Sequence, residues 1–273
     1  MRGVGRFLGV AVLIGGGAGG LAGCDSAAES GTIEVRAYGE PYVEDKIPAE
    51  AFADGWSVDF SRFLVAVSEI TSTAGGEPAV ADGKIHVVDL VPGSGKKGHL
   101  LVETEVPGGR YAETAFTVAP ATTGAVAANV SSDDVGFMIG GGLSMYIEGT
   151  AVKDGVTKRF AWRIQTTTRY VKCASKAKVD GDTATIQLTF QADRLFYDSL
   201  VAEAPLVKFD LFASADVDQN NVITLEELAG VDITGLADYQ VGSATEVTNL
   251  RAYLEALTRT LGHVDGEEPC TVE

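Results

Sequence analysis

The chain has 273 residues, and its 38 Asp and Glu outnumber its 21 Lys and Arg, so the formal net charge at pH 7 is -17. So acidic a surface argues against nucleic acids and anionic lipid headgroups as partners, because both require clustered Lys and Arg. It favours solubility and the binding of cations. The length is sufficient to bury a sizeable core, either in one large β domain or in a β domain with a small appendage.

The N-terminus has the composition of a cleaved leader. Two arginines precede an apolar, glycine-rich stretch, and the small residues Leu21-Ala22-Gly23 stand immediately before Cys24. This order predicts a secretory signal peptide over residues 1–23, since crossing a bilayer takes about 20 predominantly apolar residues and glycine dilutes this stretch. An ordinary cleaved signal followed by a free cysteine is one interpretation.

Leu21-Ala22-Gly23-Cys24 also resembles the lipobox of bacterial lipoproteins. The resemblance implies cleavage before Cys24, with a diacylglycerol on its thiol and an acyl chain on its new amine. Two or more acyl chains hold a protein stably on a membrane. We therefore expect an exported protein of the bacterial cell envelope, attached to the membrane by its N-terminal lipid and facing either the periplasm or the cell surface.

Strand patterns dominate the next part of the chain. The predicted strands cover 32–37, 57–72, 84–90, 99–106, 110–118, 144–152, 159–170 and 183–192. The apolar positions change parity between Phe60 and Phe63, which predicts a bulge or bend within one long strand. Glycine-rich turns separate the strands, and no helical pattern occurs before residue 193. The pattern therefore predicts a mainly β fold, an antiparallel β-sandwich or barrel, of which we favour the sandwich.

Helical patterns begin at residue 193. Residues 193–214 predict two short helices broken near Pro205, because proline cannot continue a helix. Leucines at steps of three and four predict a longer helix over 243–262, with Ser243 and Glu246 forming a capping box. These features predict a small C-terminal helical region.

The cysteines predict how this region is held. With Cys24 lipidated, Cys173 and Cys270 remain as an even pair in an oxidising compartment, which predicts one disulfide; two reduced, buried thiols are the alternative. Closing a loop of about 100 residues stabilises by roughly 4 to 5 kcal/mol in the chain-entropy model. The predicted organisation is a leader, a tether over 24–31, a β-sandwich domain over 32–192, and a helical region over 193–273 that the disulfide links to the sandwich.

The acidic segment ASADVDQNNVITLEELAG, residues 213–230, has oxygen-bearing side chains at regular intervals. It resembles the calcium-binding loop of EF-hands, whose ligand positions 1, 3, 5, 7, 9 and 12 fall on Asp216, Asp218, Asn220, Val222, Thr224 and Glu227. Calcium takes six to eight oxygens, so such a loop wraps around the ion before the last carboxylate closes the shell. The alternative is an acidic helix cap without metal.

One position departs from the EF-hand pattern. Position 6 is normally glycine because the chain turns sharply there with positive φ, and here it is Asn221. Asparagine tolerates that conformation better than other residues with a side chain. Since only one such loop is present and extracellular modules bind calcium weakly, we expect a structural calcium site more than a sensor.

A second resemblance covers residues 57–170. The order FSRFLVAVSEI, VVDL, VPGGRYAETAFTV, GGLSMYIEG and RFAWRIQ is similar to the β domain of the copper-binding MbnP-like periplasmic proteins. The resemblance implies an exported β-sandwich. Copper binding in that family relies on histidine in the region matching 159–170, which has none here, so the copper site is not carried over.

The function expected from the sequence is therefore a binding or structural role at the cell envelope, without catalysis, since no Ser, Thr or Cys stands in a recognisable nucleophile motif. The partners would be the membrane, through the lipid, and an unidentified ligand or envelope protein. The alternative function is a periplasmic carrier of copper or another small ligand in the β-sandwich, and an envelope enzyme ranks third.

Overall fold

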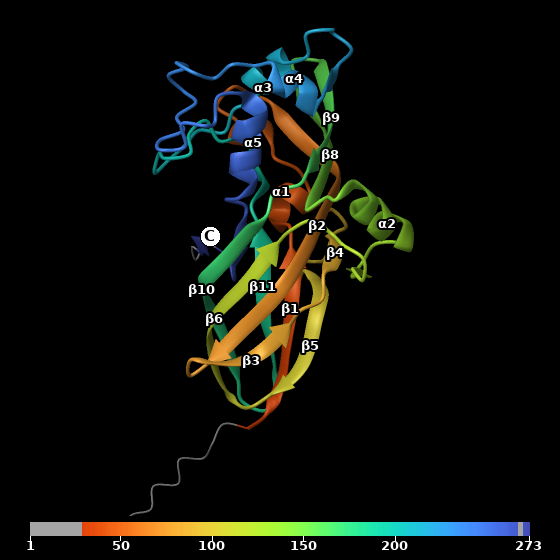
Figure 1. The fold of residues 1–273 in the computed structure, drawn as a ribbon, viewed down its shortest axis with the longest axis vertical. Helices are drawn as coiled ribbons and strands as arrows, with labels where there is room; N and C mark the ends of the chain where they lie inside the picture. Colours follow the sequence, from red (N-terminus) through yellow and green to blue (C-terminus); the bar gives the residue numbers. More distant parts are fainter. Residues whose placement is uncertain (1–28, 267–269) are drawn as a thin grey trace, which may run out of the picture.

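A computed structural model describes residues 29–266 and 270–273 (Figure 1). The expected leader, the lipobox and Cys24 lie outside the described residues. Within them, no helix is both long enough and apolar enough to cross a bilayer.

The described chain is mainly β. Its strands are β1 (Gly31–Tyr38), β2 (Ser57–Ala74), β3 (Glu77–Asp82), β4 (His86–Asp89), β5 (His99–Val106), β6 (Gly109–Val118), β7 (Val126–Ala127), β8 (Met145–Lys153), β9 (Val156–Ile164), β10 (Thr168–Val179), β11 (Thr183–Phe190), β12 (Val222–Ile223), β13 (Gly262–Val264) and β14 (Thr271–Val272). The helices are α1 (Glu40–Glu44), α2 (Ser132–Gly141), α3 (Asp210–Ser214), α4 (Leu225–Ala229) and α5 (Leu250–Thr258), with 3-10 turns at Ala49–Ala51 and Ala192–Phe196.

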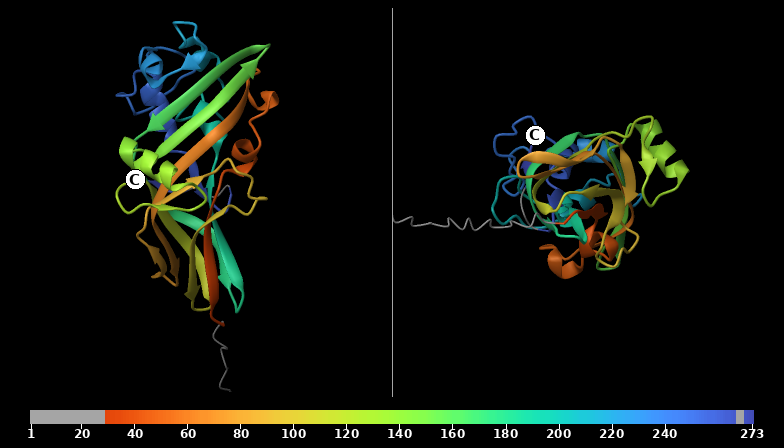
Figure 2. Two further views of the ribbon diagram at one scale, coloured as in Figure 1. Left: turned by 90° about the vertical axis from the view of Figure 1, so that its right-hand side faces the viewer. Right: turned by 90° about the horizontal axis from the view of Figure 1, so that it is seen from below.

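The strands form two sheets that curl around a common core (Figure 2). One sheet has the order β13-β11-β1-β5, and the larger sheet follows β12-β9-β8-β2-β6-β10-β14, with β3, β4 and β7 joined to it beside β2. The expectation of purely antiparallel pairing is wrong: β1 pairs with β11 in parallel, as do β12 with β9 and β4 with β7. These partners are far apart in the chain, and no hairpin imposes an antiparallel direction on them.

Strand β2 is the centre of the larger sheet, and its predicted bulge is confirmed. Its pairing with β8 shifts register between Phe60 and Arg62. Beyond the bulge, Phe63, Val65 and Val67 face the main core and are fully buried. The long strand therefore bends without exposing its apolar face to water.

Helix α2 covers the other face of β2, and the sequence did not predict it. Met138 of the helix packs with Leu64 and Ala66 of the strand in a second, smaller apolar cluster. The helix begins with a capping box between Ser131 and Asp134 and ends at Gly142, which has φ 57°. Glycines at its C-terminal end lower the helix propensity, so no helical pattern was evident here, whereas the capping box was the available helix signal.

Two strand boundaries also differ from expectation. Residues 159–170, predicted as one strand, belong to two strands, because β9 ends at Ile164 and β10 begins at Thr168. Strand β9 pairs with β8, whereas β10 pairs with β6, so the chain changes neighbours between them. Polar residues on both sides of the break keep the alternation, so periodicity alone does not reveal it. Strand β3, the short strands β7, β13 and β14, and residues 171–179 of β10 were not predicted.

The C-terminal helix is shorter than predicted. Helix α5 starts at Leu250, and the side chain of Asn249 caps it by accepting a hydrogen bond of 3.0 Å from the amide of Ala252. Ser243 forms no capping box, because the preceding chain is held in a loop: Leu250 N donates to Val231 O at 3.0 Å. Residues 193–214 contain a 3-10 turn and α3 on either side of Pro205, in place of two α-helices.

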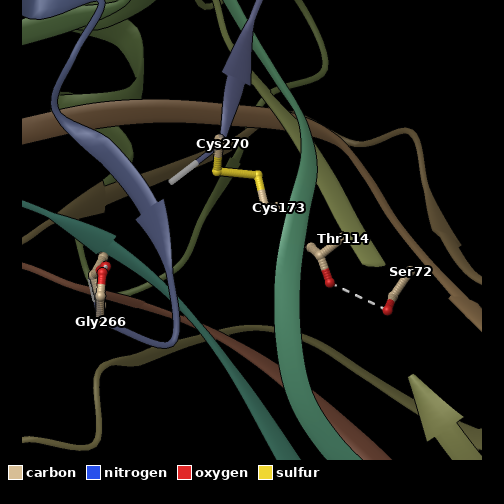
Figure 3. The surroundings of a disulfide bond; sticks show 6 residues. Ser72, Thr114, Cys173, Gly266 and Cys270 are labelled. Carbon is tan, nitrogen blue, oxygen red and sulfur yellow. Dashed lines mark hydrogen bonds between the residues drawn. A yellow bond between two sulfur atoms is a disulfide. The ribbon is translucent and has the colours of Figure 1, made fainter. Parts of the chain in front are cut away.

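The C-terminal region is tied back to the sheets by its ends. Strand β13 pairs with β11, and β14 pairs with β10. Cys173 of β10 and Cys270 form a disulfide, with 4.2 Å between their Cα atoms (Figure 3). The predicted disulfide is confirmed, and it lies beside the short pairing of β14 that it holds in place.

We expect the variant Cys270→Ser to lose about 2 to 4 kcal/mol of unfolding free energy, because the open chain gains conformational entropy when unfolded. Urea denaturation of the oxidised protein and the variant measures the difference. Reductant added to the unmodified protein should produce the same loss, and an unfolding free energy insensitive to both changes would contradict the prediction.

Candidate metal centre

The acidic loop lies at one end of the elongated molecule, between α3 and α4 (Figure 1). Asp216 follows the short helix α3, and Glu227 stands within α4. Thr224 is the N-cap of α4: its hydroxyl accepts from the amide of Glu227 at 3.1 Å, and the Glu227 carboxylate accepts from the amide of Thr224 at 2.8 Å. This capping box explains why the helix starts here and where its glutamate points.

Three of the expected ligand residues meet. Asp216, Asp218 and Glu227 each offer a carboxylate oxygen, and these oxygens all lie within 4.8 Å of one another. Asp216 is buried, Glu227 is half-buried and Asp218 is exposed. Among residues 29–266 and 270–273, this is the one group of three or more His, Cys, Asp or Glu side chains spaced to hold a metal ion.

The carboxylate of Asp216 organises the first half of the loop. Its Oδ1 accepts from the amide of Asn220 and its Oδ2 from the amide of Asn221, both at 3.0 Å. Its Oδ2 also accepts from the ammonium of Lys158 on β9. The Lys158 hydrogen bond, helped by that of the Asn221 amide, lowers the pKa of Asp216 against the opposing effect of desolvation. The residue is therefore ionised at neutral pH, as a calcium ligand must be.

Asn220 and Val222, the expected ligands at positions 5 and 7, lie within the same turn. Asn220 Oδ1 accepts from the amide of Val222 at 2.6 Å, and the Asn220 amide group donates to Asp218 Oδ2 at 2.8 Å. An amide oxygen has two lone pairs, so Oδ1 keeps one available for a cation. Val222, whose carbonyl would be the ligand, begins β12.

The loop turns with two left-handed residues. Asn221 has φ 63° and Gln219 has φ 59°. The sharp turn expected at position 6 is thus made by an asparagine in the conformation that glycine usually adopts there. The turn at this position therefore forms without glycine, at a moderate conformational cost to Asn221.

Strand β12 attaches the loop to the larger sheet. Val222 and Ile223 pair in parallel with Arg159 and Phe160 of β9, and the amide of Arg159 donates to Asn221 O at 2.9 Å. The buried indole N–H of Trp162 donates to Ile223 O at 3.1 Å. The second half of the loop is therefore part of the sheet and its core.

Lys158 is the one residue at this centre that sequence reasoning missed. The alternation of the strand could have revealed it, because Lys158 stands two and four residues before Phe160 and Trp162 and so lies on the same, core-facing side of β9. A lysine at a core-facing position needs a charged partner, and that partner is Asp216.

Comparison of the chain with models of protein families, with curated proteins and with solved structures finds no match.

The positive φ of Asn221 predicts that different substitutions at this position change the unfolding free energy by different amounts. We expect Asn221→Val to lose about 1 to 2 kcal/mol of unfolding free energy, because a β-branched side chain is strained at φ 63°. The control Asn221→Gly should stay within about 0.5 kcal/mol of the unmodified protein, since glycine adopts positive φ without strain. Both values come from urea denaturation, and equal losses in the two variants would show that the conformation is not the cause.

Proposed function

We propose that this protein is an exported, lipid-anchored component of the bacterial cell envelope with a binding or structural role, and that one calcium ion organises its 216–227 loop. The observation that supports the metal site is the convergence of three carboxylate oxygens within 4.8 Å. Asp216, Asp218 and Glu227 would hold the ion, with Asn220 Oδ1 and the carbonyl of Val222 adding neutral oxygens. Thr224, at position 9, would contribute through water.

The donor set favours calcium over a transition metal. Every donor is oxygen, and hard oxygen donors suit calcium and magnesium, whereas copper and zinc favour imidazole and thiolate. The carboxylate group contains no His or Cys. Among the described residues, His86, His99 and His263 belong to no group of three or more metal-ligand side chains. The donors therefore give no support to the alternative of a copper carrier.

The attachment of the loop supports a structural role for the ion. Because β12 is paired with β9, a cation bound by the loop would draw α4 toward the larger sheet and screen three neighbouring negative charges. The gain in stability would follow the concentration of calcium. An ion in this place stabilises the folded form and needs no second loop.

The position of the expected lipid supports a particular orientation of the protein relative to the membrane. Gly31, the first residue of β1, lies at the end of the molecule opposite α3 and α4 (Figure 1). Six residues, 25–30, lie between Cys24 and Gly31, so the tether spans at most about 25 Å when extended. A protein anchored at Cys24 would therefore hold its calcium loop away from its own membrane.

The calcium site is tested by titration. We expect the domain that starts after Cys24 to bind one calcium ion with a Kd of roughly 10⁻⁴ to 10⁻³ M, and about 10 mM calcium to raise the unfolding free energy by roughly 1 to 3 kcal/mol. Calorimetry measures the affinity, and urea denaturation measures the stabilisation.

Two glutamine variants locate the ion. Glu227→Gln should abolish binding, because it removes the carboxylate that closes the shell. Glu226→Gln is the matched control: the neighbouring residue is exposed and outside the carboxylate group, so its affinity should be unchanged. Absence of heat and of stabilisation at millimolar calcium in the unmodified domain would refute the site.

The anchor is tested on the full-length chain. We expect the protein expressed in a bacterium to partition into the detergent phase of Triton X-114 and to carry labelled palmitate, because two or more acyl chains hold it on the membrane. Cys24→Ser should abolish both properties, whereas Cys270→Ser, a matched loss of one thiol, should keep them. If the unmodified protein stayed in the aqueous phase and carried no labelled palmitate, the lipid anchor would be contradicted.

A further inference from the structure

Lys158 reaches the acidic loop from a different part of the chain. Its ammonium contacts Asp216 Oδ2 and lies 3.3 Å from Asn221 Oδ1, and the lysine precedes Asp216 by 58 residues. The Lys158 side chain is 13% exposed, and that of Asp216 is fully buried. The two charges therefore meet in a place that water reaches poorly, where an ion pair is screened less than at the surface.

The register between β12 and β9 fixes this contact. The amide of Arg159 donates to Asn221 O, so the residue before it stands beside the loop. Lys158 lies on the same face of β9 as the buried Phe160 and Trp162, at the end of that face next to the loop, and is itself half-buried. Because strand pairing fixes the backbone of Lys158, its ammonium can separate from Asp216 only if the side chain rotates into solvent.

The ammonium binds one oxygen of a carboxylate that a cation would share. Oδ2 of Asp216 accepts from both the Lys158 ammonium and the Asn221 amide, which fills its two lone pairs, whereas Oδ1 accepts from the Asn220 amide and has a second lone pair with which to bind a cation. A divalent ion on the same carboxylate and the ammonium would repel each other over a few ångströms in a poorly solvated site. Lys158 and a bound cation therefore compete for Asp216.

We propose that Lys158 is an internal counter-ion of the loop, which calcium must displace from Asp216 in order to bind. The proposal rests on the calcium site proposed above. When no ion is bound, the lysine neutralises one of three clustered carboxylates and keeps the loop folded. When calcium binds, the lysine turns toward solvent, so the exchange sets the affinity of the site and makes it weaker than its carboxylates alone would give.

Calcium titration of Lys158→Met tests the competition. We expect the Kd to fall by about tenfold or more relative to the unmodified domain, because the competing charge is gone while every ligand remains. Lys153→Met is the matched control, since Lys153 lies at the end of neighbouring β8 and pairs with Asp210, outside the loop. It removes the same charge, and its Kd should stay within about threefold of the original, because salt screens exposed charges.

The outcomes separate the two proposals. Calcium binding by neither the unmodified domain nor Lys158→Met would refute the calcium site itself. Calcium binding by both with a Kd equal within about threefold would leave the site standing and overturn the role of Lys158. An equal gain in Lys153→Met and Lys158→Met would also overturn it, since net charge alone would then explain the effect.

A second measurement uses the unmodified domain and so does not depend on the folding of a variant. Amine acetylation followed by peptide mass spectrometry measures how readily each lysine reacts. We expect calcium to increase the labelling of Lys158 several-fold and to leave Lys153 unchanged. Calcium that binds while the labelling of Lys158 stays constant or falls would show that the ammonium remains in place, which would overturn the exchange.

Discussion

The hydrogen bond from the indole N–H of Trp162 to the carbonyl of Ile223 joins the sheet to the acidic loop. Trp162 is fully buried, and its ring lies 4.3 Å from that of Phe160 and 5.9 Å from that of Phe212, measured between centroids. A buried indole N–H needs an acceptor, because an unsatisfied polar group in the core is costly. Ile223 supplies it and is itself buried in the same core. The position of the loop therefore follows from the packing of the aromatic core, before any ion is considered.

In the loop attached to β9, the clustered carboxylates determine which interactions the loop can make. Three carboxylates within 4.8 Å repel one another, and the strongly acidic chain does not relieve that repulsion. The fold offsets it with backbone amides directed at Asp216 and with the ammonium of Lys158. The backbone amides stabilise the loop as a turn, and the Lys158 ammonium neutralises part of the charge that the proposed calcium ion would otherwise meet. Structure and proposed cation binding are thus two consequences of one cluster.

Much of the β architecture was predictable because side chains alternate with the period of a strand. The limits of β5, 99–106, were predicted as the structure has them, and so was the bulge after Phe60. Helix α2 was missed because its glycines lower helix propensity, and tertiary packing of Met138 against β2 compensates for that loss. The convergence of Asp216, Asp218 and Glu227 was predictable, since the expected loop is a local pattern of twelve residues. Its attachment to β9 was not.

Features that depend on near neighbours in the chain follow directly from the amino-acid order: the spacing of Asp216, Asp218 and Glu227, the turn at Asn221 and the alternation of the strands. The sequence also predicted the disulfide between Cys173 and Cys270, on the expectation that Cys24 carries a lipid. The parallel pairing of β1 with β11 and of β12 with β9 depends instead on tertiary packing. Those partners are chosen by burial of a shared core across long separations, and periodicity carries no information about them. The contact between Lys158 and Asp216 results from the pairing of β12 with β9, so the sequence pattern did not reveal it.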